Sequence, residues 1–173
     1  MNKNQFYPFM LKGSAFFPEP IVNRGLLLKV LFQDGTEEIL STTAQSFLNQ
    51  IIQFFGYDLV ALRKQYGQAI GKRQMVPLPL LEDWILIPLK LSNQLNGEFF
   101  LGFVVAQSMV HMEEENKSIT KLFLEGNHKI YCGHRISFCN QQIRHAALVQ
   151  HRYRLLHGKG NLQLKEGRLS YFL

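Results

Sequence analysis

Two segments in which apolar and polar residues alternate on both sides of a turn constrain the fold of this chain more than any other feature. In the first, alternation over residues 26–40 surrounds Asp34-Gly35, a dipeptide that tight turns favour. In the second, alternation over residues 122–130 surrounds Gly126. A period of two places one face of each strand against a core. The chain is therefore predicted to form antiparallel β-hairpins.

Three other segments have the apolar spacing of three and four residues that is typical of helices. The first follows a capping threonine, Thr42 or Thr43, and stops at Gly56, whereas the second begins after Asp58. The third and longest is expected over residues 137–156. We therefore predict an α+β fold in which antiparallel β-hairpins pack against two or three helices.

Further extended segments are expected around these elements. Two short apolar runs, residues 84–89 and 99–105, are predicted to be buried strands, and Pro88 is expected to end the first of them. The tail, residues 162–172, alternates again and is predicted to form a terminal hairpin.

Size and composition predict one domain, spanning residues 1–173, in a cytoplasmic protein. Of the 173 residues, 46% are hydrophobic, and a chain of this length buries about 70% of its unfolded surface. Two cysteines, Cys132 and Cys139, are too few for a secreted disulfide framework. The apolar runs are shorter than the roughly 18 residues of a membrane span, and Pro8 and Lys12 interrupt the apolar stretch at the N-terminus. We expect no membrane partner.

The charge pattern indicates an anionic partner. Residues 126–165 contain no aspartate or glutamate, although they carry five of the chain's 6 histidines and seven of its 19 lysines and arginines. The cations are Lys129, Arg135, Arg144, Arg152, Arg154, Lys159 and Lys165. Solvated helix faces normally mix both signs of charge. A one-sided basic surface is typical of proteins that bind nucleic acid.

A second run without carboxylates, residues 59–81, takes in the second predicted helix and the segment after it. An arginine guanidinium binds phosphate through two hydrogen bonds or enters a narrow minor groove. The predicted DNA contacts come from both runs, and they are Arg63, Lys64, Lys72, Arg73, Arg144, Arg152, Arg154 and Lys159. Whether both runs contact one duplex depends on how the helices pack.

The sequence carries no recognisable catalytic motif. It has no P-loop, no dinucleotide-binding glycine pattern after a strand, no nucleophile elbow and no H-E-x-x-H pair. Four residues that zinc accepts, Cys132, His134, Cys139 and His145, have a spacing that matches no standard zinc finger or ribbon. We therefore expect a protein that is not an enzyme and that requires no metal and no cofactor.

The start of the third predicted helix resembles the S-F-x-N-Q-x-x-R-x-A-x-L string of the bacterial competence transcription factor ComK family. The matching residues are Ser137, Phe138, Asn140, Gln141, Arg144, Ala146 and Leu148. Other landmarks follow in the family's order, namely Phe54-Phe55-Gly56, Arg63-Lys64, the apolar run 85–88 with Ser92, and residues 124–130 about Gly126. The resemblance covers roughly residues 30–155.

This resemblance implies a sequence-specific activator of genes for DNA uptake. Members of the family bind paired A/T-rich boxes of double-stranded DNA, chiefly through the minor groove. They act as homodimers or higher oligomers on DNA, and an adaptor-guided protease controls them. A/T-rich tracts have a narrow minor groove whose negative potential attracts arginine. Arg144 is the one cation inside the matched string and thus the strongest candidate contact, followed by Arg63 and Lys64.

Three other functions stay open at the level of sequence. An RNA-binding module would prefer single strands or A-form helices to duplex DNA. A nucleic-acid-processing enzyme built around the histidines would show metal-dependent turnover that requires His134 or His145. A protein-interaction module would use its basic face to bind an acidic partner.

Overall fold

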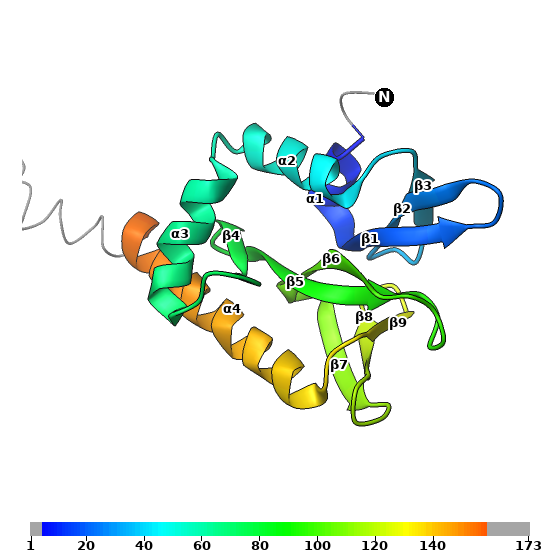
Figure 1. The fold of residues 1–173 in the computed structure, drawn as a ribbon. Helices are drawn as coiled ribbons and strands as arrows, with labels where there is room; N and C mark the ends of the chain where they lie inside the picture. The colour runs from blue at the N-terminus through cyan, green and yellow to red at the C-terminus, as the bar shows by residue number, and fades with distance from the viewer. Residues whose placement is uncertain (1–4, 159–173) are drawn as a thin grey trace, which may run out of the picture.

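The computed structural model describes residues 5–158, in which helices lie against an antiparallel β-sheet (Figure 1). The helices are α1 (Tyr7–Lys12), α2 (Ala44–Phe54), α3 (Leu59–Ile70) and α4 (Ile136–His157), with a short 3-10 helix η1 (Ala106–Ser108). The strands are β1 (Gly13–Ile21), β2 (Gly25–Phe32), β3 (Glu37–Leu40), β4 (Leu78–Leu81), β5 (Trp84–Ser92), β6 (Phe100–Val105), β7 (Met109–Glu114), β8 (Thr120–Leu124) and β9 (His128–Cys132). The predicted α+β class is confirmed, in a single domain. The hairpin predicted for residues 162–172 lies outside the described residues.

The strands form one sheet in the order β3-β2-β1-β6-β5-β9-β8-β7, and β4 pairs with the start of β5. Both predicted hairpins are present, β2 with β3 about Gly35 and β8 with β9 about Gly126. In Figure 1, α1 and α2 lie near β1, whereas α3 and α4 lie together beside β4 and β5. Two separate groups of helices therefore cover the sheet.

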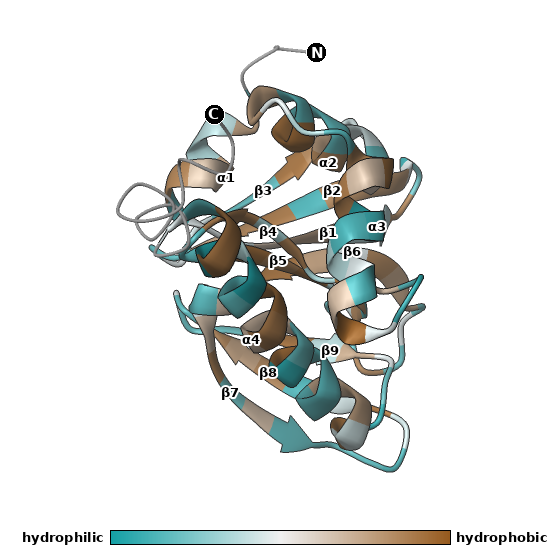
Figure 2. Ribbon diagram, turned by 90° about the vertical axis from the view of Figure 1, so that its left-hand side faces the viewer, coloured by the Kyte–Doolittle hydropathy of each residue, from teal (hydrophilic) through white to brown (hydrophobic). Residues whose placement is uncertain are grey.

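An aromatic cluster joins the first group of helices to the sheet. The ring of Phe16 in β1 lies 5.1 Å from that of Phe9 in α1, 4.9 Å from that of Phe47 in α2 and 5.3 Å from that of Phe103 in β6. All four side chains are buried, and burial of each phenylalanine contributes about 1.5 to 3 kcal/mol. Hydrophobic colouring accordingly follows the central strands in Figure 2, while the helices carry both hydrophobic and hydrophilic residues.

The ends of α2 and α3 lie where the sequence predicts them. The side chain of Thr43 accepts a hydrogen bond from the Ser46 N–H at 3.0 Å, and that of Asp58 accepts one from the Ala61 N–H at 2.8 Å. Each bond satisfies a backbone donor that the first helical turn leaves free. At its other end, α3 stops at Gly71, which has the left-handed backbone conformation with φ of 69°.

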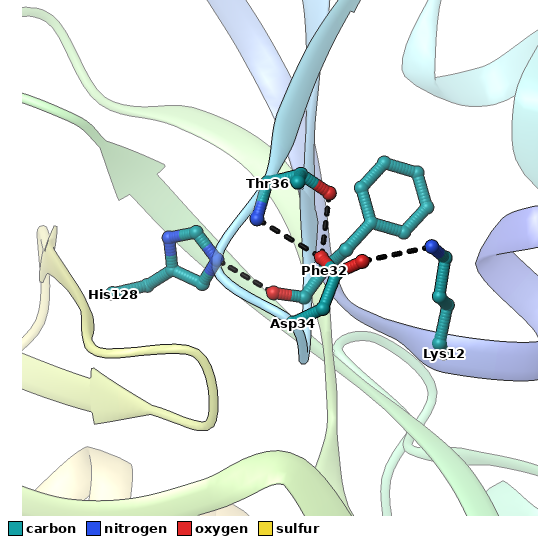
Figure 3. A network of polar contacts seen from close by, with 5 residues as sticks. All are labelled: Lys12, Phe32, Asp34, Thr36 and His128. Carbon is teal, nitrogen blue, oxygen red and sulfur yellow. Dashed lines mark hydrogen bonds and ion pairs between the residues drawn. The ribbon is translucent and has the colours of Figure 1, made fainter.

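The β2–β3 turn is held by contacts from two distant parts of the chain (Figure 3). Asp34 accepts hydrogen bonds from the Lys12 ammonium at 2.8 Å and from the backbone and hydroxyl of Thr36 at 3.0 and 2.6 Å. These donors hold the pKa of Asp34 well below its ordinary value. On the other side, Nε2 of His128 donates to the Phe32 carbonyl oxygen at 2.7 Å. The hairpin β8–β9 therefore reaches back to the hairpin β2–β3.

Two buried serines reinforce this contact between the hairpins. The Ser108 hydroxyl donates to that of Ser14 at 2.6 Å, and the Ser14 hydroxyl donates to the Glu125 carbonyl oxygen at 3.1 Å. At the same place the backbone of Gly126, with φ of 93°, approaches the backbone of Gly35. The sheet is thus curled so that turns at distant positions in the strand order touch each other.

The expectation that Pro88 ends its strand is wrong, because β5 continues to Ser92. One side of β5 pairs with β6 over residues 86–91, whereas the other side pairs with β4 at its start and with β9 at residues 91 and 92. The Lys90 N–H points into the gap between β4 and β9. Residues two apart direct their backbone groups to the same side of a strand. The backbone nitrogen of Pro88, which carries no hydrogen, therefore faces this gap, and the sheet loses no hydrogen bond there.

Three strands, β1, β4 and β7, were not predicted from the sequence. β1 contains Pro18 and Pro20, which depress strand propensity, but both lie beyond the part of β1 that pairs with β6, at Ala15 and Phe16. β7 carries too few apolar residues for a period of two to be visible. Pairing with β8 maintains it as a strand at the edge of the sheet.

Candidate nucleic-acid interface

Helix α3 and the turn after it present the first set of predicted cations. Tyr66 is buried and fixes the inner side of the helix. Lys64 is exposed and Arg63 is half-buried on the same helix, while Lys72 and Arg73 follow its end, half-buried and exposed respectively. The helix is thus anchored by its apolar side, with its charges on the outside.

Helix α4 presents the second set. It spans 22 residues and confirms the helix predicted for residues 137–156. Ala146 and Val149 are buried against the sheet, whereas Arg144 and Arg152 are exposed. Because residues eight apart lie about two turns away on the same side of a helix, these two arginines mark one outer face.

The packing of α3 on α4 joins the two sets into one surface. Nζ of Lys72, after the end of α3, lies 5.1 Å from the ring of Phe138 at the start of α4. Near the other end of the pair, burial raises the pKa of Tyr66 to about 12, and the positive charge of Arg152 opposes that shift. The two helices therefore run in opposite directions, and both basic runs of the sequence lie on the same side of the molecule, as Figure 1 shows.

Carboxylates of residues 5–158 leave most of this surface unneutralised. Six predicted contacts form no ion pair with any carboxylate of residues 5–158: Arg63, Lys64, Lys72, Arg73, Arg144 and Arg152. Arg154 differs, because its guanidinium lies 2.9 Å from a Glu82 carboxylate oxygen and 3.7 Å from one of Asp83. We name the six unpaired residues the α3–α4 basic surface.

The α3–α4 basic surface is hollowed rather than flat. Arg63, Lys64, Lys72 and Arg73 all line a depression along α3. Arg63 and Arg73 also line a second hollow of about 270 Å³, whose walls include Met75. Partial burial lowers the pKa of Arg63, although an arginine stays charged in proteins. Two arginines that line one hollow supply the donors that bind a phosphate.

Two histidines of the carboxylate-free run lie beside this surface. Burial lowers the pKa of His134, and the charges of Lys90 and Lys72 lower it further. Burial likewise lowers the pKa of His145, with Lys72 and Arg144 acting in the same direction. The side chain of His145 is only 9% exposed, and its Nδ1 has no hydrogen-bond partner in the described part of the chain. Both pKa shifts therefore arise first from burial and second from the neighbouring positive charges.

No protein-family model, curated protein or solved structure matches this chain. Within residues 5–158, no helix is long and apolar enough to cross a membrane.

The predicted contacts thus divide into three groups. Six form the α3–α4 basic surface, Arg154 is ion-paired, and Lys159 lies outside the described residues. Sequence reasoning missed Lys90, an exposed cation of β5 whose charge acts on His134. No local pattern could have identified it, because it stands inside an apolar strand and reaches this surface only through the contact of β5 with His134.

The four residues considered for zinc have other roles here. Sγ of Cys132 lies 3.5 Å from Sγ of Cys139, and both thiols are buried and free. Nε2 of His134 accepts a hydrogen bond from the Lys90 N–H at 3.1 Å. Among residues 5–158, no group of three or more histidine, cysteine or acidic side chains is arranged to hold a metal ion.

Proposed function

We propose that this chain is a cytoplasmic, sequence-specific transcriptional regulator that binds double-stranded A/T-rich DNA through the α3–α4 basic surface. The observation that carries the proposal is the gathering of six unpaired cations from two separate runs onto one pair of helices. Such charges favour binding because they release the counterions that surround DNA phosphates. The proposal assigns the chain no catalytic role, no metal and no cofactor.

The dimensions of α4 suit a duplex. At about 1.5 Å per residue, its 22 residues extend over about 33 Å, which is comparable to one turn of B-DNA at about 34 Å. Arg144 and Arg152 are spaced along its exposed face, so they reach phosphates at different positions of one strand. Arg63 and Arg73 add contacts from α3.

A/T preference is proposed on chemical grounds and on the resemblance to the ComK family. Runs of A/T base pairs narrow the minor groove and strengthen its negative potential, which favours an inserted arginine. The resemblance places Arg144 inside the matched string and supports activation of DNA-uptake genes, assembly as a homodimer or larger oligomer on DNA, and control by an adaptor-guided protease.

Fluorescence anisotropy with labelled A/T-rich duplex, G/C-rich duplex and single-stranded RNA tests this function. We expect the A/T-rich duplex to bind most tightly at physiological salt. Arg144→Ala should weaken its binding by about 1 to 3 kcal/mol. The matched control is Lys117→Ala, because Lys117 is an exposed cation of the β7–β8 turn and is not part of the α3–α4 basic surface.

Equal affinity for both duplexes would contradict a sequence-specific regulator. Tighter binding of RNA than of either duplex would instead favour an RNA-binding module. Equal losses in Arg144→Ala and Lys117→Ala would show that net charge, and not this surface, determines binding.

A further inference from the structure

Strand β7 forms one edge of the sheet within residues 5–158. It is the last strand in the order and pairs only with β8 among the described strands. At the β7–β8 turn, the Glu115 N–H donates to the Ile119 carbonyl oxygen at 3.0 Å. Alternate residues of an antiparallel strand direct their backbone groups toward the same neighbour. The backbone groups of Glu113 therefore face β8, and those of Met112 and Glu114 face outward.

A hollow of about 380 Å³ adjoins this edge. Strand β7 forms one wall, helix α4 forms the other, and the buried residues Ile85 and Ile87 of β5 contribute to the lining. On the α4 side the lining includes Ala146 and Ala147, whose short side chains leave the space open. None of the described residues that line it is a lysine, arginine, aspartate or glutamate. The hollow is thus suited to apolar side chains.

Exposed carboxylates stand at the far end of β7. Glu113 lies 3.3 Å from His111, whereas Glu114 and Glu115 form no ion pair within residues 5–158. An antiparallel strand added to β7 would begin beside Glu114 and run toward Met109. The first residues of such a strand would therefore meet negative charge, and its later residues would meet the apolar hollow.

We propose that the β7 edge and the adjoining hollow bind an extended peptide segment of another protein. The segment begins with lysine or arginine residues and continues with alternating apolar side chains. Backbone hydrogen bonds to the outward groups of Met112 and Glu114 supply affinity, while the hollow and the carboxylates supply specificity. This site shares no residue with the α3–α4 basic surface, so it is independent of the proposed DNA binding.

The first test measures anisotropy of a labelled peptide in which two lysines precede valine-threonine repeats, without DNA. Ala147→Trp fills the hollow from an exposed position of α4 and should weaken binding by about tenfold or more. Leu148→Trp is the matched control, because Leu148 is exposed but does not line the hollow. Equal affinity of both variants for the peptide would overturn the proposal.

The second test separates the backbone contact from the charge. Glu114→Pro removes an outward N–H while the β7–β8 ladder keeps its bonds, and Glu114→Gln removes the charge alone. We expect the proline variant to lose more peptide affinity than the glutamine variant, with unchanged circular dichroism in both. A peptide with glutamates in place of its lysines should bind about tenfold more weakly than the original.

Two results would refute the peptide site whatever the variants do. One is equal binding of the lysine and glutamate peptides. The other combines two findings: the peptide does not bind, and sedimentation velocity detects a dimer that Ala147→Trp dissociates. A second copy of the chain would then occupy the edge. Loss of DNA binding alone would leave the proposal intact.

Discussion

At the scale of single residues, two side chains take the place of a neighbouring strand along β5. Nε2 of the buried Gln142 donates to the carbonyl oxygens of Pro88 and Met75, each at 3.0 Å. Next to it, the unprotonated Nε2 of His134 accepts from the Lys90 N–H. Met75 has the unusual left-handed backbone conformation, with φ of 54°. Gln142 therefore satisfies a β5 carbonyl that has no strand partner, and it also holds the strained residue Met75.

The burial of His134, together with the charges of Lys90 and Lys72, makes stability depend on pH. The pKa of His134 is lowered in the folded protein from its ordinary value of 6.5, so the unfolded chain binds the proton more readily. The stabilisation is fully present above about pH 6.5 and is lost as the pH falls below that value. We expect the free energy of unfolding, measured by urea titration, to decrease between neutral pH and about pH 5.

The variant His134→Gln should reduce this pH dependence, because an amide oxygen accepts the Lys90 N–H without titrating. His145, whose pKa is also lowered, retains part of the effect. His151→Gln, at an exposed position of α4, serves as the control and should leave the pH dependence unchanged. An identical slope in the wild type and His134→Gln would refute the role given to this side chain.

At the scale of elements, the sequence predicted those whose ends are marked by local chemistry. The threonine and aspartate caps and the glycine stops located α2 and α3, and the turn sequences about Gly35 and Gly126 located two hairpins. Strand β7 has no such local signals. The prediction that Pro88 ends its strand was wrong because the effect of a proline depends on which side of the strand is paired. The charges of the candidate site were equally visible in the sequence. Their union on one surface was not, because it depends on the packing of α3 against α4.

The turn at Gly126 provides the test at this scale. A Cβ atom at this position would lie 2.5 Å from the Phe32 carbonyl oxygen and 2.9 Å from the Gly35 nitrogen. Its φ of 93° is also unfavourable for any other residue. Gly126→Ala should therefore lower the free energy of unfolding by about 2 to 4 kcal/mol, as measured by urea denaturation. The control is Gly25→Ala, at a φ of 80°, where no atom of residues 5–158 lies within 4 Å of the added Cβ. If Gly126→Ala loses no more stability than this control, the contact between the turns is unimportant.

At the scale of the whole molecule, α4 serves two different surfaces. Arg144 and Arg152 belong to the α3–α4 basic surface, while Ala146 and Ala147 of the same helix line the hollow beside β7. One rigid helix thus positions the proposed DNA contacts and the proposed peptide site on different sides. Because the two sets of residues do not overlap, we expect the proposed DNA and the proposed peptide not to compete for one molecule.

The salt dependence of DNA binding shows whether both helices contact the same duplex. Each phosphate contact contributes about −0.9 to the slope of log affinity against log salt. We expect Arg63→Ala and Arg144→Ala each to reduce the slope by about that amount, and the double variant to reduce it by about twice as much. If only one helix meets DNA, one of the single variants will keep the wild-type slope.

The curled sheet also determines when the domain is complete during synthesis. Ala15 and Phe16 of β1 pair with Val104 and Phe103 of β6, and Ser14 bonds to Ser108 and to the Glu125 carbonyl oxygen. The first strand therefore cannot complete its contacts until the ribosome has released most of the later strands. Contacts this distant in sequence slow folding and leave apolar segments exposed meanwhile. Phe16 can meet Phe9 and Phe47 early in synthesis, but its contact with Phe103 must wait until β6 has been synthesised, so the side of the first strand that pairs with β6 stays uncovered until then.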